Sequence, residues 1–129
     1  KNGALEEIPE LNSEEIVSIL LARAGHRVMA RQNAGHDRIV DEKKTEIKFA
    51  LATGRNVDYA CIFNHIGLKK DWEQIIFVCV NGDGNIKGKL FQKDELPLSL
   101  LNRQQGGQSG DNDDYMVAGE NAIKLLNSS

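Results

Sequence analysis

The run Gln74–Val80 constrains the fold of this chain most strongly. Six consecutive apolar residues follow Gln74, and Asn81-Gly82-Asp83-Gly84 after them is turn chemistry. A continuous apolar run of strand length that ends in turn residues predicts a buried β-strand. Residues 86–91 then predict the next strand. The fold is therefore expected to contain a sheet with a buried central strand.

The remaining segments predict helices around this sheet. Asn12 and Glu15 have the form of a capping box, and apolar residues recur at helical spacing up to Gly25, which predicts a first helix. The other expected elements are a strand at 27–31, a hairpin of strands 36–40 and 45–49 with a turn at 41–43, a strand beside it at 57–63, a helical stretch at 94–101, a polar loop at 104–114 and a last helix at 117–126. This order fits an α/β fold with a central mixed β-sheet flanked by helices.

Composition indicates one ordinary globular domain over residues 1–129. The chain is 40% hydrophobic and 27% charged, with no apolar run long enough to cross a bilayer and no signal-peptide pattern. We therefore expect a cytoplasmic protein with no membrane partner. Cys61 and Cys79 each lie in an apolar run, and so few thiols favour buried free cysteines over a disulfide framework. Because the sequence starts at Lys1 without a methionine, a fragment of a longer chain stays open.

Charge is unevenly distributed along the chain. The net charge of -3 taken alone argues against nucleic acid, since phosphate is bound mainly by lysine and arginine. Between residues 21 and 55 the basic residues nevertheless predominate: Arg23, Arg27, Arg31, Arg38, Lys43, Lys44, Lys48 and Arg55 stand against Asp37, Asp41, Glu42 and Glu46. The same segment contains the strongest chemical pattern in the sequence.

The predicted hairpin brings two carboxylates and an amine together. Successive side chains of a strand point to opposite faces, so Glu46 and Lys48 share one face while Ile47 points to the other. The turn places the preceding strand alongside, where Asp37 can converge with Glu46. Carboxylates and the backbone carbonyl of Ile47 are oxygen ligands that suit Mg²⁺ or Mn²⁺. With Lys48 beside such a cation, the pattern suits hydrolysis of a phosphodiester.

Asp37 followed by Glu46-Ile47-Lys48, with a glutamate-bearing helix before them, resembles the PD-(D/E)xK nuclease superfamily. The resemblance implies a restriction-endonuclease-like fold with a metal ion held by Asp37, Glu46 and the Ile47 carbonyl. It implies that Lys48 orients or activates the attacking water. In that family an acidic residue on the first helix often joins the metal site, and Glu14 is the residue to which this role carries over.

Each candidate residue also has a plainer interpretation. Glu46 and Lys48 can form a surface ion pair that contributes little, and Glu14 can be a first-turn acid that favours the helix dipole. Asp41 is an alternative first ligand, although its position suits a turn former. His36 stands where the family usually has proline, and a lone histidine seldom takes part in catalysis.

The residues thus favour a metal-dependent endonuclease that acts on nucleic acid, with DNA preferred over RNA. By analogy with relatives of the same fold, a homodimer that cuts both strands is one expected arrangement. Two alternatives stay open. One is an RNA-cleaving toxin nuclease domain, and the other is a non-catalytic nucleic-acid-binding or assembly module that keeps the fold.

Overall fold

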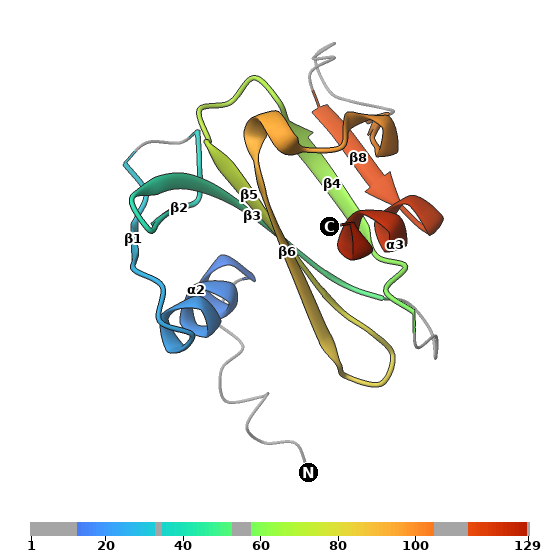
Figure 1. Ribbon diagram of the computed structural model, residues 1–129, viewed down its shortest axis with the longest axis horizontal. Coiled ribbons are helices and arrows are strands. Elements are labelled where there is room, and N and C mark those ends of the chain that lie inside the picture. The colour runs from blue at the N-terminus through green and yellow to red at the C-terminus, as the bar shows by residue number, and fades with distance from the viewer. Residues whose placement is uncertain (1–12, 33–34, 53–57, 105–113, 129) are drawn as a thin grey trace.

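A computed structural model describes residues 13–32, 35–52, 58–104 and 114–128, and in them the chain forms two sheets (Figure 1). The larger sheet has the order β1-β2-β3-β5-β6, with strands β1 (Val28–Ala30), β2 (Arg38–Val40), β3 (Lys43–Leu51), β5 (Gln74–Val80) and β6 (Ile86–Gln92). The smaller sheet has the order β4-β8-β7, with strands β4 (Ile62–Gly67), β8 (Asp114–Ala118) and β7 (Asn102–Arg103). The helices are α2 (Ser13–Arg23) and α3 (Glu120–Asn127).

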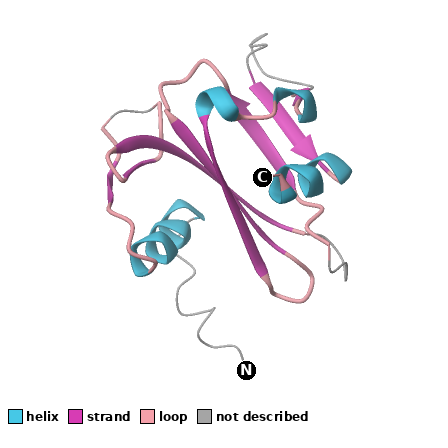
Figure 2. Cartoon of the chain, in the orientation of Figure 1, coloured by secondary structure: helices cyan, strands magenta, loops and turns pink. Residues whose placement is uncertain are grey.

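The larger sheet is mixed because β5 runs parallel to β3 and antiparallel to β6. Its two faces are covered by different parts of the chain, and Figure 2 shows α2 and α3 on opposite sides of its strands. On one face Ile76 and Val78 pack with Val17 of α2. On the other face Phe77 belongs to the core shared with the smaller sheet and α3. The predicted α/β fold with a central mixed sheet is therefore confirmed at this level.

Aromatic rings fill the core between the two sheets. The ring of Phe77 meets that of Phe63 from β4 edge to face, with centroids 4.9 Å apart, and that of Phe91 from β6 at 6.1 Å. Helix α3 adds Ala122, Leu125 and Leu126, all buried. Such edge-to-face pairs favour one arrangement of the rings, so the core fixes β4 against the face of the larger sheet.

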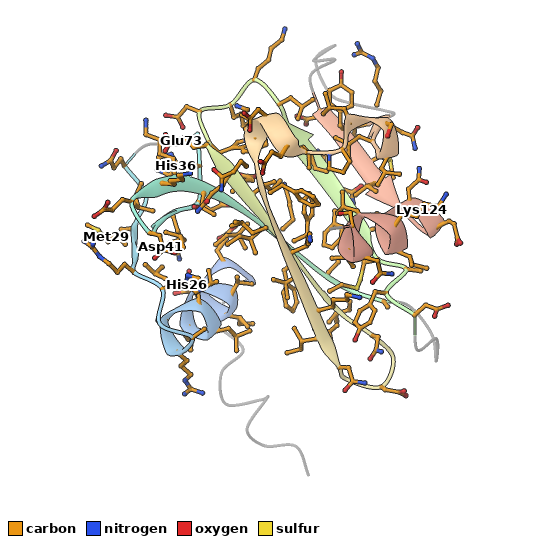
Figure 3. All side chains as sticks on the ribbon, in the orientation of Figure 1. His26, Met29, His36, Asp41, Glu73 and Lys124 are labelled. Atoms are coloured by element: carbon orange, nitrogen blue, oxygen red, sulfur yellow. A yellow bond between two sulfur atoms is a disulfide. The ribbon has the colours of Figure 1, made fainter. Side chains whose placement is uncertain are left out.

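The predicted hairpin is confirmed as β2 and β3, joined by a two-residue turn. Asp41 and Glu42 have positive φ values of 51° and 71°, as a type I′ turn requires. The Asp41 carboxylate accepts the Arg27 N–H at 2.9 Å and lies 2.7 Å from Nδ1 of His26. Figure 3 shows His26 and Asp41 beside α2. Asp41 therefore stabilises the turn, as its plainer interpretation predicts.

Three expected elements differ from the structure. The strand expected at 57–63 beside the hairpin is instead β4, which begins at Ile62 and pairs with β8 in the smaller sheet. The helical stretch expected at 94–101 forms two short 3₁₀ turns, Lys93–Glu95 and Leu98–Leu100, with Pro97 between them. The last helix begins only at Glu120, because the preceding residues form β8. Asn12 of the expected capping box lies outside the described residues.

The expectation of free cysteines is wrong, because Cys61 and Cys79 form a disulfide. Their Cα atoms are 6.3 Å apart, and both side chains are buried. Cys61 immediately precedes β4 and Cys79 belongs to β5, so the bond links the two sheets. Across the residues that the structure describes, no helix is long and apolar enough to span a membrane.

We predict that removing this disulfide destabilises the protein by about 3 kcal/mol, the loss expected when a loop of 18 residues is no longer closed in the unfolded chain. Urea denaturation of the protein with and without reductant measures the loss. The double variant Cys61→Ala/Cys79→Ala is the control, since reductant should not shift its midpoint. Equal midpoints for the oxidised and reduced wild type would contradict the prediction.

Candidate active site

Asp37 lies just before β2, and the register of the hairpin determines where it points. Arg38 pairs with Thr45, so one step further out Asp37 stands opposite Glu46. The Asp37 N–H donates to the Thr45 carbonyl at 2.9 Å, and Asp37 Oδ2 accepts the Ile47 N–H at 2.7 Å. These bonds hold the carboxylate against β3. The Ile47 carbonyl faces the same side, because the N–H and C=O of a strand residue point to one edge.

Glu46 and Lys48 project from β3 toward the smaller sheet. Glu46 is only 8% exposed, and its Oε2 lies 3.3 Å from Nζ of Lys48. Lys48 Nζ also donates to the carbonyl oxygen of His65 on β4, at 2.9 Å. The ammonium group is therefore held between the two sheets. This is a largely buried ion pair and not the exposed pair of the plainer interpretation.

Electrostatics connect the two carboxylates. The pKa of Glu46 is raised, first by burial and then by the negative charge of Asp37, while Lys48 and Lys70 act in the opposite direction. A carboxylate that is both buried and close to another carboxylate gains when a cation binds between them. A divalent cation held by both carboxylates of the patch formed by Asp37, Glu46 and Lys48 would therefore offset this repulsion.

The donor set fits Mg²⁺ or Mn²⁺. Two carboxylates with a nearby carbonyl oxygen are hard ligands, and Mg²⁺ is commonly held by one or two carboxylates while water and phosphate complete its shell. Within the described ranges no group of three or more His, Cys, Asp or Glu side chains is placed to hold a metal ion. Asp37 and Glu46 would thus supply only part of such a shell.

Glu14 is not brought to this patch. It lies in the first turn of α2, whose buried Val17 packs with Ile47 and with two residues of β5. Ile47 alternates with Glu46 along β3, so α2 covers the face of the sheet opposite to the Glu46 side. A ligand role for Glu14 stays a prediction that this arrangement does not favour, and its position suits the helix dipole.

His36, next to Asp37, has a structural role. Its ring is buried, Nε2 accepts the Gln32 N–H at 3.1 Å, and Nδ1 lies 3.1 Å from Asp71 Oδ1. Lys44 also reaches the Asp71 carboxylate, at 3.2 Å. Figure 3 shows His36 at the same end of the sheet as Glu73. Both ring nitrogens have partners within the protein, so His36 positions the segment that leads to Asp37.

Asp41, the alternative ligand, is not placed to serve as one. Its pKa is lowered, chiefly by the hydrogen bond from the Arg27 N–H and then by His26. Both of its oxygens are engaged at the hairpin turn. Asp37, at the other end of β2, is the aspartate that lies beside Glu46.

Two residues near the patch carried no signal in the sequence. Lys70 follows β4, and its charge acts on the pKa of Glu46. His65 lies within β4, and its carbonyl binds Lys48. Both reach the site because β4 packs against β3 across the core, a contact that local sequence patterns do not reveal.

We predict that Glu46→Gln stabilises the metal-free protein at neutral pH, because burial and the charge of Asp37 disfavour the ionised glutamate. The pKa of Glu46 in the folded protein lies above its ordinary value of 4.5, so the unfolded chain loses this proton first as the pH rises. Ionised Glu46 therefore lowers the free energy of unfolding at pH 7.5. Below pH 4.5 both states are protonated, and the advantage of the variant should disappear.

Urea denaturation in chelator at pH 7.5 and pH 4 measures this difference. Glu42→Gln is the matched control, because Glu42 is an exposed glutamate that also pairs with a basic residue, Arg27. Its stability should stay within a few tenths of a kcal/mol of the wild type at both pH values. An unchanged or reduced stability of Glu46→Gln at pH 7.5 would contradict the prediction, because the buried Glu46 charge would then not lower the free energy of unfolding.

The chain was compared with protein-family models and with curated protein sequences, and neither comparison finds a match. The relation to the PD-(D/E)xK superfamily therefore remains a prediction based on the residues of the hairpin.

Proposed function

We propose that this chain hydrolyses phosphodiester bonds of nucleic acid with the help of Mg²⁺ or Mn²⁺, and that its substrate is DNA rather than RNA. Asp37 and Glu46 would hold the cation, together with the Ile47 carbonyl. Lys48 would be the catalytic amine. In this proposal the larger sheet, with α2 before the hairpin, is a restriction-endonuclease-like core.

One observation carries the proposal. The carboxylate of Asp37 is tied to the backbone of β3 at Ile47, between the two residues whose side chains form the Glu46–Lys48 pair. Two carboxylates and an ammonium group therefore come together from β3 and from the residue just before β2. A surface ion pair needs neither the buried Glu46 nor a second carboxylate fixed by a backbone hydrogen bond.

Each protein group has a role that its surroundings support. A divalent cation supplies Lewis-acid polarisation of a phosphoryl oxygen when it is bound. Asp37 Oδ2 is kept in place by the Ile47 N–H, so the other carboxylate oxygen, Oδ1, can face the cation. Lys48 is anchored by Glu46 and by the His65 carbonyl. From there its ammonium group can orient a water molecule and stabilise the negative charge that develops on the phosphate.

The surroundings of the site favour a polyanionic substrate. Lys48 of β3 and Lys70, which follows β4, both bring positive charge to the Glu46 carboxylate. These residues lie on the two sides of the boundary between the sheets, here called the inter-sheet seam. Phosphates are bound by such cations, with release of counterions from the nucleic acid. In the sequence, basic residues also predominate between 21 and 55, despite the net charge of -3.

The test is cleavage of plasmid DNA, single-stranded DNA and RNA with Mg²⁺, with Mn²⁺ and with chelator. We expect metal-dependent cleavage, strongest on DNA, and a loss of at least about 100-fold in Lys48→Ala, because a charge-stabilising donor is removed. The control is Lys124→Ala, which removes an exposed lysine from α3 (Figure 3). It should cut like the wild type.

The outcomes separate the open alternatives. Cleavage of RNA alone would favour the toxin-type nuclease. Folded wild-type protein that cuts none of the three substrates with either metal would contradict the proposal and favour a binding module. Equal rates for Lys48→Ala and the wild type would show that the activity does not belong to this site.

A further inference from the structure

The strand β4 carries an irregularity next to the candidate site. Its register with β8 shifts between Phe63 and Ile66, so Asn64 and His65 form a bulge. His65 has a φ of 58°, a left-handed conformation that is uncommon for residues other than glycine. Bulges of this kind often redirect a side chain beside an active site, and strained backbone persists only where its surroundings hold it.

Three partners hold His65 in this conformation. Its carbonyl accepts the Lys48 ammonium at 2.9 Å, and its N–H donates to Gln104 Oε1 at 3.0 Å. Its ring Nδ1 lies 3.3 Å from Asp114 Oδ2 on β8. The partners come from both sheets, so the position of His65 is determined by the same seam that holds Lys48.

The ring itself remains open to a ligand. The side chain of His65 is 68% exposed, whereas that of Asp114 is 26% exposed. With Nδ1 directed at the Asp114 carboxylate, Nε2 is the nitrogen that a molecule approaching the site would meet. An imidazolium donates from both nitrogens, so it can join a carboxylate on one side to a phosphate on the other.

We propose that His65, oriented by Asp114, binds a phosphate of the nucleic-acid strand on the Lys48 side of the site. The inference rests on the proposed function for the identity of the ligand. His65 acts here as a substrate-binding residue, and Lys48 remains the residue that acts at the reacting phosphate. The bulge places the His65 carbonyl oxygen against the Lys48 ammonium group. In the proposal, the ring of the same residue contacts the substrate phosphate.

The test measures binding separately from cleavage. Fluorescence anisotropy in chelator, in an acidic buffer in which histidine is an imidazolium, gives the Kd of labelled duplex DNA, single-stranded DNA and RNA oligonucleotides over a range of salt concentrations. For His65→Ala we expect about a tenfold higher Kd on the probe that the wild type binds best, since one charge-assisted hydrogen bond is lost. The slope of log Kd against log salt should fall by about 0.7 to 0.9, as for one phosphate contact.

Three further variants make the result specific. His65→Gln keeps a donor without the charge, so it should recover part of the affinity but not the salt slope. Asp114→Asn removes the orienting carboxylate and should give an intermediate Kd. The matched control is His26→Ala, because His26 is also an exposed histidine paired with an aspartate, Asp41, but lies at the hairpin turn beside α2. It should bind like the wild type.

Each outcome is informative about a different claim. Equal Kd and salt slope for His65→Ala and the wild type would overturn the inference, and so would an equal loss in His26→Ala or a wild type that binds no probe. If His65→Ala does not fold, His65→Gln and Asp114→Asn decide in the same way. A wild type that binds through His65 but cuts nothing with metal would contradict the proposed function alone.

Discussion

Strand β5 is buried on both faces, and each face holds a different part of the molecule. Ile76 and Val78 pack under α2, while Phe77 packs against the aromatic rings of β4 and β6. Parallel pairing along its whole length then fixes β3 beside it, from Thr45 at one end to Leu51 at the other. Because the alternation of side chains is strict, this pairing decides that Glu46 and Lys48 face the seam between the sheets.

Two groups at the inter-sheet seam lower the stability of the fold, namely the buried Glu46 carboxylate and the left-handed backbone of His65. Burying Glu46 beside Asp37 disfavours its charged form, and only part of this cost is offset by Lys48 and Lys70. The left-handed conformation of His65 adds strain a short distance away. Perturbed pKa values and strained backbone conformations are both more frequent at binding and catalytic sites than elsewhere. The surrounding core, with the disulfide between Cys61 and Cys79, supplies the stability that they require.

Much of the larger sheet could be predicted because its signals are local. The apolar run of β5 and the alternation along β3 are visible in short windows of sequence, and they place Asp37, Glu46 and Lys48 on one hairpin. The smaller sheet was missed because β8 pairs with β4, about fifty residues earlier in the chain. The partners of His65 and Lys70 depend on that pairing, so no local pattern indicates them. Spacing alone also cannot show that two cysteines approach each other, nor which face of the sheet α2 covers.

The central claim is that Asp37 and Glu46 share one divalent cation, and direct binding of Mn²⁺ tests it without requiring catalysis. Electron paramagnetic resonance titration of the folded wild type should show one bound ion, and Asp37→Asn should lose it. The asparagine oxygen can still accept the Ile47 N–H, so the variant removes charge while the hairpin keeps its hydrogen bond. Mn²⁺ bound equally by the wild type and Asp37→Asn, or by neither, would contradict the account.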